Sequence, residues 1–202
     1  MTDTLNGIRA GWAMCGSFCT FERSFSAMEQ LSALGAEITV IMSFNSAEID
    51  SRFGTAAEHT ALAEKISGRP VIRSIAEAEP IGPRKMFDIL ICAPCTGNTA
   101  AKLCAGITDT PVTMAVKSHL RGGLPVLLAF STNDALTASA KNIAELLNRK
   151  NYYFVPVRQD DPLKKPASAA ADLSLLPRAA LEALNGRQLQ PLLLAPLGTA
   201  AE

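Results

Sequence analysis

Apolar runs and amphipathic segments alternate along almost the whole chain. Continuous apolar runs predict strands that are buried on both faces, as in a parallel sheet. These runs cover residues 8–14, 37–42, 87–93 and 125–130, with shorter ones at 70–75 and 152–157. The segments between them carry apolar residues at helical spacing. They predict helices over 20–34, 56–66, 96–105 and 111–121, a helix that follows 131–134 and ends near 147, and a last helix over 168–184.

This strand–helix alternation, without hairpin turn signals, predicts an α/β fold of the Rossmann-like or flavodoxin-like kind. We expect three layers, with about six parallel strands in one sheet and helices on both of its faces. Residues 1–202 are predicted to form one domain, because a chain of this length can bury a single large core. We expect an irregular loop at 77–85, a restart or kink of the last helix at Pro177 with Ser174 as its cap, and an extended tail from about 186.

The charge balance excludes some classes of partner. Lysine plus arginine and aspartate plus glutamate number 19 each, so the formal net charge is zero. Such a chain has no basic field for nucleic acid and no polybasic run for anionic membranes. No apolar run approaches the roughly 18 residues that span a bilayer. We therefore expect a cytoplasmic protein without nucleic-acid or membrane partners.

Small, uncharged polar residues follow four of the predicted strands. The carboxyl ends of parallel strands meet at one edge of a sheet, where ligands bind, and a helix N-terminus there attracts phosphate. The set therefore predicts a neutral cradle for a phosphate and a flat heterocycle. The alternative is that these residues only cap helices, as in any α/β protein. The candidate cofactor-binding residues are Gly16, Ser17, Phe18, Ser43, Asn45, Thr96, Gly97, Asn98, Thr99, Ser131, Thr132 and Asn133.

Cys92 and Cys95 have the spacing of redox and metal-binding pairs. A zinc site needs about four ligands, and the other cysteines and histidines form no second close pair. The sequence therefore predicts no metal site, and it favours core filling plus a turn residue over dithiol chemistry. Pro94, between the two cysteines, is expected to end the strand because it has no N–H for the ladder.

A basic cluster at 117–121 ends a predicted helix. Its positive charges are favourable against the helix C-terminus, which is the structural interpretation. The functional alternative is a site for substrate carboxylates at Lys117 and Arg121, with His119 as a proton donor. Lys165 lies in the charged loop 158–166, which is either a solvated loop or a lid over a ligand.

The turn Gly16–Ser17 and the stretch Ala93–Lys102 together resemble the flavoprotein family of homo-oligomeric cysteine decarboxylases. The family motif is Pro-Ala-Ser-Ala-Asn-Thr; Asn98 and Thr99 match it, and Thr96 stands for the serine. The resemblance implies a Rossmann-like fold, FMN bound at the matching strand ends and a trimer-based homo-oligomer.

Later segments are more similar to one branch of this family, the B subunits of a two-subunit synthase that makes pyridine-2,6-dicarboxylate during spore formation. They are residues 117–121, 131–134, 152–156, 159–162 and 165–168. The resemblance implies a partner A subunit with NAD(P), a small dicarboxylate substrate and a place in the mother-cell cytoplasm. The decarboxylases' Pro-x-Met-Asn segment is replaced here by Phe130–Asn133, which argues against decarboxylation of a cysteine-bearing substrate. That activity and a non-catalytic scaffold for the A subunit are the alternatives.

Overall fold

The structure, a computed structural model, describes residues 4–195. Its strands are β1 (Arg9–Met14), β2 (Glu37–Met42), β3 (Ile89–Cys95), β4 (Val126–Thr132), β5 (Tyr152–Phe154), β6 (Val157–Arg158) and β7 (Ala169–Ala171). Its helices are α1 (Phe21–Ala33), α2 (Phe44–Glu48), α3 (Ala56–Ser67), α4 (Ile75–Ala78), α5 (Gly97–Ala105), α6 (Pro111–Leu120), α7 (Ala140–Leu147) and α8 (Leu176–Leu184). Among these residues no helix is both long and apolar enough to cross a membrane.

The seven strands form one sheet in the order β2-β1-β3-β4-β7-β6, with β5 also paired to β4. Strands β2, β1, β3, β4 and β5 are all parallel to their neighbours. The predicted Rossmann-like α/β fold is therefore confirmed. The short strands β6 and β7 extend the sheet beyond the far end of β4, and their pairings are antiparallel.

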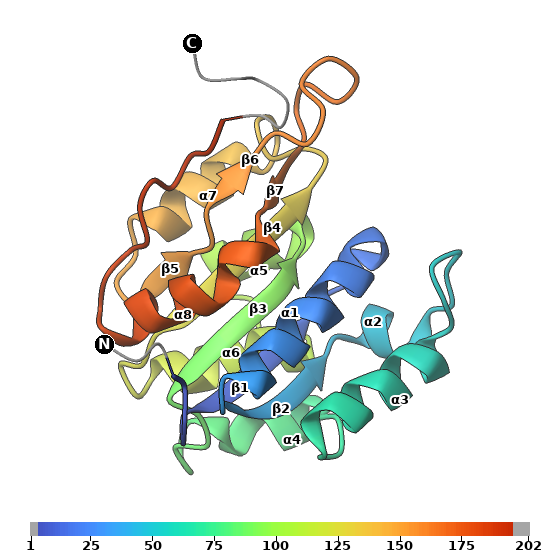
Figure 1. The fold of residues 1–202 in the computed structure, drawn as a ribbon, viewed down its shortest axis with the longest axis vertical. Helices are drawn as coiled ribbons and strands as arrows, with labels where there is room; N and C mark the ends of the chain where they lie inside the picture. Colours follow the sequence, from blue (N-terminus) through green and yellow to red (C-terminus); the bar gives the residue numbers. More distant parts are fainter. Residues whose placement is uncertain (1–3, 196–202) are drawn as a thin grey trace.

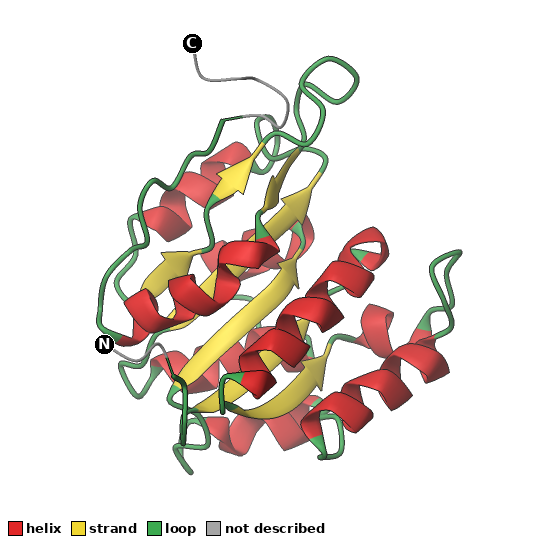
Figure 2. Cartoon of the chain, viewed as in Figure 1, coloured by secondary structure: helices red, strands yellow, loops and turns green. Residues whose placement is uncertain are grey.

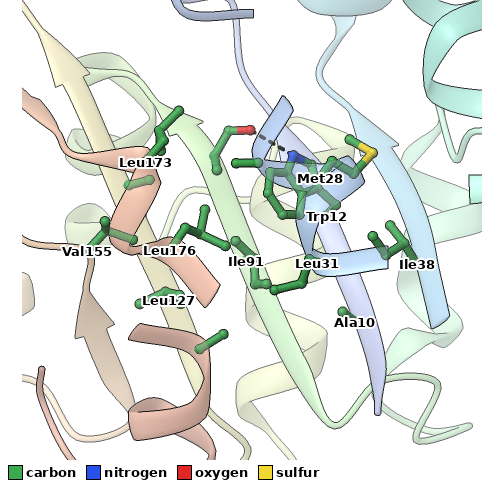
Figure 3. Close-up of a cluster of buried hydrophobic side chains, with 14 of the residues drawn as sticks. Ala10, Trp12, Met28, Leu31, Ile38, Ile91, Leu127, Val155, Leu173 and Leu176 are labelled. Carbon is green, nitrogen blue, oxygen red and sulfur yellow. Dashed lines mark hydrogen bonds between the residues drawn. The ribbon is translucent and has the colours of Figure 1, made fainter. Parts of the chain in front are cut away.

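Helices cover both faces of the sheet, which makes the three predicted layers (Figures 1 and 2). Helices α1 and α8 pack on one face, and α5, α6 and α7 pack on the other. Side chains alternate between the two faces along each strand. Trp12 and Ile91 therefore meet Met28, Leu31 and Leu176 in the core under α1 and α8 (Figure 3).

We expected strand β3 to end at Pro94, but it continues to Cys95. The register with β4 shifts between Cys92 and Cys95, which marks a bulge. The shift puts Cys95 on the same face as Cys92, whereas strict alternation would separate residues three apart. The prediction failed because a bulge accommodates a proline that has no N–H for the ladder.

At this bulge the carbonyl oxygen of Ala93 accepts hydrogen bonds from two side chains. It accepts hydrogen bonds from Trp12 Nε1 at 3.0 Å and from Ser24 Oγ at 2.6 Å. Trp12 and Ser24 are both fully buried. The two side chains therefore tie β1 and α1 to the bulged end of β3.

The segment between α3 and β3 differs from the prediction. Residues 70–75 form no strand; Ile72 alone bridges to Ile41 of β2. The expected loop 77–85 instead begins within α4, which Ser74 and Glu77 cap reciprocally, and continues as a short 3-10 helix, Glu79–Ile81. The capping box was a readable signal here, but the segment is too short for apolar periodicity to show it.

The last third of the chain is more broken than predicted. Helix α7 begins only at Ala140, and the expected strand 152–157 is divided between β5 and β6. The expected helix 168–184 starts instead as β7, because residues 169–171 pair with both β4 and β6.

The restart at Pro177 is confirmed, since Pro177 lies in the first turn of α8. Asp172, rather than Ser174, supplies the cap of the short turn before α8. After the turn at Asn185 and Gly186 the chain runs back beside β6, where Val157 pairs with Leu193. Residues 196–202 of the expected tail lie outside the described residues.

The two donors to Ala93 O predict a non-additive loss of stability. Ser24→Ala removes one donor while Trp12 remains, so we expect a loss of about 1 kcal/mol in the free energy of unfolding. Combining it with Trp12→Phe leaves this buried oxygen without a side-chain donor. The double variant should therefore lose more than the sum of the two single losses.

Urea unfolding of the single and double variants measures this coupling. Ser26→Ala, at an exposed position two residues along the same helix, is the matched control and should unfold like the wild type. Strictly additive losses would show that the two donors act independently.

Candidate functional site

Three neighbouring strands, β1, β2 and β3, end around one cleft of about 370 Å³, here called the α5 cleft. Its lining from these strand ends consists of Cys15, Gly16, Ser43, Phe44, Asn45, Thr96, Asn98 and Thr99. Lys102, Asp109 and Thr110 complete the wall from α5 and the turn before α6. The carboxyl edge of the sheet thus carries a cleft with a largely uncharged polar lining.

A second cleft of about 440 Å³, here called the loop cleft, adjoins the first and shares Gly16 and Thr96 with it. Ser17, Cys19, Arg23, Ser131, Thr132, Asn133, Asp160, Lys165, Ser168 and Ala170 also line it. The segment between β6 and β7 forms one wall. All the predicted cofactor-binding residues except Phe18 and Gly97 therefore line one cleft or the other.

The start of α5 separates the two clefts. Thr96 caps this helix, because its Oγ1 accepts a hydrogen bond from Thr99 N at 3.1 Å. Among the described residues, no acceptor is paired with the N–H groups of Gly97 and Asn98, which belong to the first turn. Free N–H groups and the helix dipole favour an anion at this position.

Two glycines beside this helix are closely packed. A Cβ added at Gly16, which lines both clefts, would lie 3.3 Å from Asn45 Cβ. A Cβ at Gly97 would lie 2.3 Å from Ser139 Oγ. Gly97 thus lets α5 pack against the turn after β4. Phe18, the other predicted residue that lines neither cleft, packs on Phe21 with ring centroids 5.3 Å apart.

Hydroxyl groups connect the ends of β1 and β4. Thr20 Oγ1 and Ser131 Oγ lie 2.7 Å apart, and Ser17 Oγ donates to Ser131 Oγ at 3.3 Å. Beyond β4, Asp134 accepts hydrogen bonds from Thr132 Oγ1 and from Ser139 Oγ. Those hydrogen bonds, first of all the one from Thr132, lower the pKa of Asp134. The turn is therefore ordered by an ionised carboxylate.

Charged residues also line the clefts; of these, sequence analysis singled out Lys165 but not Arg23 or Lys102. Arg23 projects from α1 into the loop cleft and has no side-chain partner among residues 4–195. Lys165 Nζ lies 3.2 Å from Asp160 Oδ2 in the same cleft. Lys102 Nζ pairs with Asp109 at 2.8 Å in the α5 cleft. Lys102 could have been found from the sequence, because it lies four residues after Asn98 and so on the same face of α5. No local pattern indicates that Asp160 and Arg23 meet in one cleft.

The cysteines near the α5 cleft form a buried thiol cluster. Cys15 Sγ lies 3.7 Å from Cys92 Sγ, and it accepts a hydrogen bond from Thr99 Oγ1 at 3.1 Å. Contact with Cys92 and burial raise the pKa of the Cys15 thiol well above its usual value. Thiols in this state are packing groups rather than nucleophiles. In the described part of the chain, no group of three metal-ligating side chains could hold an ion.

The basic cluster at the end of α6 does not reach either cleft. Lys117 and Arg121 line a different cavity. His119 is buried, with Nε2 3.1 Å from the carbonyl oxygen of Pro125, and burial lowers its pKa to about 4. A neutral histidine with a backbone partner is a structural residue, so the geometry does not support His119 as a proton donor in the clefts.

Comparison with known proteins identifies relatives of this chain. The sequence model of the Flavoprotein family matches residues 1–172. The dipicolinate synthase B subunit of Bacillus subtilis (strain 168) is 43% identical over 191 residues, which are 95% of this chain and 96% of that protein. The chain is thus a close homologue of that protein.

Solved structures agree with this comparison. The crystal structure of the dipicolinate synthase B subunit from Bacillus halodurans has a TM-score of 0.87 and 38% identity, covering 95% of this chain and 98% of that chain. Burkholderia xenovorans DmrB in complex with FMN has a TM-score of 0.65 and 19% identity, covering 88% of this chain and 96% of that chain. At that identity the second likeness shows a shared fold alone.

The hydrogen bonds to Asp134 predict a pH-dependent effect of Asp134→Asn. A carboxyl group whose pKa is lowered by folding stabilises the protein above its unfolded pKa, about 3.9, and loses that contribution as the pH falls through the folded pKa. We expect the variant to be less stable than the wild type at pH 7, with a gap that shrinks below about pH 4.

Urea midpoints at pH 7 and in the acid range measure that gap. Glu48→Gln makes the same carboxylate-to-amide change at an exposed position and is the control. A gap for Asp134→Asn that is independent of pH would contradict the role given to this carboxylate.

Proposed function

The chain belongs to the Flavoprotein family, and on that premise we propose that it serves a two-subunit dipicolinate synthase by holding FMN and the dicarboxylate precursor. The observation that carries the proposal is the pair of connected clefts at the carboxyl edge of the sheet, one largely uncharged and one that cations enter. The close homology to the dipicolinate synthase B subunit supports it.

The α5 cleft fits the phosphate and polar parts of FMN. The free N–H groups at the start of α5 suit a phosphate, as in other anion sites at helix N-termini. Ser43 and Asn45 face the same space from β2, and Gly16 leaves room for a ligand that crosses between the clefts. Ser131, Thr132 and Asn133 then offer hydrogen-bonding groups to a heterocycle in the loop cleft.

The loop cleft fits a small dicarboxylate better than the end of α6 does. Two carboxylates need two cationic partners, and Arg23 and Lys165 enter this cleft from α1 and from the segment between β6 and β7. Asp160 holds Lys165 at one side of the cleft. We therefore assign substrate recognition to Arg23 and Lys165 in place of Lys117 and Arg121.

Formation of a pyridine ring from a dihydropyridine-type precursor removes two electrons and two protons, and bound FMN supplies an electron acceptor. This chain's residues bind and orient the precursor. Burial raises the pKa of Asp160, but hydrogen bonds from Ser168 and Lys165 outweigh it and lower the pKa overall. Asp160 is thus an ionised carboxylate that holds Lys165 at the substrate side of the cleft.

Assembly with other chains is part of the proposal. Large apolar side chains are exposed on loops that follow the strand ends, namely Ile49, Phe53, Leu136 and Leu163. Burial of such side chains favours association. We assign these loops to contacts within a trimer-based homo-oligomer and to contacts with an A subunit, which would carry NAD(P). The proposed location of this assembly is the mother-cell cytoplasm of a spore-forming organism.

Asn98→Asp tests the FMN cradle. The variant replaces an amide donor at the start of α5 with a carboxylate, which repels a phosphate. We expect the dissociation constant for FMN, measured from the change in flavin absorbance, to rise at least tenfold, or about 1.4 kcal/mol.

Asn6→Asp makes the same change at an exposed residue far from both clefts and should bind FMN like the wild type. Equal FMN affinity in the Asn98 variant and the wild type would rule out the assigned cradle.

The double variant Arg23→Gln/Lys165→Gln tests substrate recognition. Each glutamine keeps much of the side chain's length but removes its charge, so the carboxylates lose their ionic partners. We expect KM for the precursor, assayed with the A subunit present, to rise at least tenfold while FMN affinity stays unchanged.

The control variant Lys141→Gln/Arg178→Gln removes the same two charges at exposed positions on α7 and α8. A normal KM in the Arg23/Lys165 variant would place the dicarboxylate elsewhere.

A further inference from the structure

A cavity of about 480 Å³, here called the basic cavity, lies away from both clefts. The last turns of α6, the end of α5 and the turn between α7 and β5 surround it. Asn151 and Tyr152 belong to its wall, so it opens at the edge of the sheet where β5 begins. Among the described residues, none that lines this cavity also lines the α5 cleft or the loop cleft.

Basic side chains enter the cavity from two elements. Lys117 lies in the last turn of α6 and Arg121, four residues on, is its C-cap, so both side chains extend from one face of that helix. Arg149 and Lys150 come from the turn between α7 and β5. No described acidic residue lines the cavity, and Lys117, Arg121 and Lys150 have no side-chain partner within residues 4–195. In a chain of zero net charge, this is a local excess of positive charge.

The floor between these cations is apolar. Leu103 and Val116 are buried there, and the ring of Tyr152 packs beside them. Burial raises the pKa of Tyr152 to about 12, so its hydroxyl stays protonated. That hydroxyl has no hydrogen-bond partner in the described part of the chain. It is therefore a donor available to a ligand oxygen.

One wall of the cavity is held rigidly. Arg149 donates hydrogen bonds to the carbonyl oxygens of Leu103 at 3.1 Å and Cys104 at 2.7 Å, at the end of α5. Its Nε also pairs with Glu145 at 3.2 Å. These contacts fix the turn that presents Lys150, so a ligand meets a preformed site and loses less entropy on binding.

We propose that the basic cavity is a second binding site for a small aromatic dicarboxylate, the class to which pyridine-2,6-dicarboxylate belongs. A flat ring matches the apolar floor, and carboxylates on two sides of the ring reach cations on two elements. An inorganic phosphate would leave the floor unused, and a fatty acid has only one charged group. The choice of ring rests on the proposed function, whereas the cationic and apolar lining does not.

The proposal assigns the product a site outside the clefts where it would be formed. Helix α6 begins beside Thr110, which lines the α5 cleft, and ends at Lys117 and Leu120 in the basic cavity. Product bound there does not compete with FMN for any lining residue.

Isothermal titration calorimetry of the full chain with pyridine-2,6-dicarboxylate, in metal-free buffer, tests the proposal. We expect two sites per wild-type chain, and loss of one of them in Lys117→Gln/Arg121→Gln. Tyr152→Phe should weaken the same site severalfold without altering the far-ultraviolet circular dichroism spectrum. Lys141→Gln/Arg178→Gln is the charge-matched control and should bind like the wild type.

The variant Arg23→Gln/Lys165→Gln separates this inference from the proposed function. Retention of the cavity site in that variant, with loss of the cleft site, supports both. If the Lys117/Arg121 variant loses all binding and the Arg23/Lys165 variant binds like the wild type, the result supports the basic cavity. It also contradicts substrate binding in the loop cleft. Wild-type binding in the Lys117/Arg121 variant, or equally tight binding of inorganic phosphate or neutral pyridine, overturns the inference.

Discussion

The carboxyl edge of the sheet, where the candidate site lies, depends on the hydrogen bonds that the carbonyl oxygen of Ala93 accepts. A buried carbonyl without a donor is costly, so β3 can bulge at Pro94 only because Trp12 and Ser24 supply hydrogen bonds. The bulge places Thr96 where it caps α5 between the two clefts. The core under α1 and the position of the candidate site are thus set by the same interaction.

The two clefts differ in the charge of the side chains that line them. Strand ends supply hydroxyl, amide and free N–H groups, which suit a cofactor with a phosphate and a polar chain. Cations enter from outside the strand ends, from Arg23 on α1 and Lys165 before β7. This arrangement agrees with homology to one subunit of a dicarboxylate-forming synthase, and it leaves decarboxylation of a cysteine-bearing substrate as a secondary interpretation.

The parallel sheet also separates two kinds of ligand site. Its carboxyl edge holds the α5 cleft and the loop cleft, whereas the basic cavity lies beside the start of β5. Helix α6 connects the two regions and is anchored midway along the fold: Ser118 Oγ donates to the carbonyl oxygen of Glu79 at 2.6 Å, and His119 is buried against Pro125. Residues that are neighbours on this helix therefore have different environments: His119 packs in the interior, whereas Lys117 lines the basic cavity.

The sequence by itself determined the strand–helix order, the Rossmann-like class and the polar strand ends. The reason is that the spacing of apolar residues and helix caps such as Thr96 are local properties of the chain. Tertiary structure alone decided that β3 continues past Pro94, since the donors that stabilise its bulge are 81 and 69 residues away. It also decided that 169–171 join the sheet and that Arg23, rather than Arg121, faces the loop cleft. A local pattern specifies what a segment can form, whereas contacts between distant segments specify which charges meet at a site.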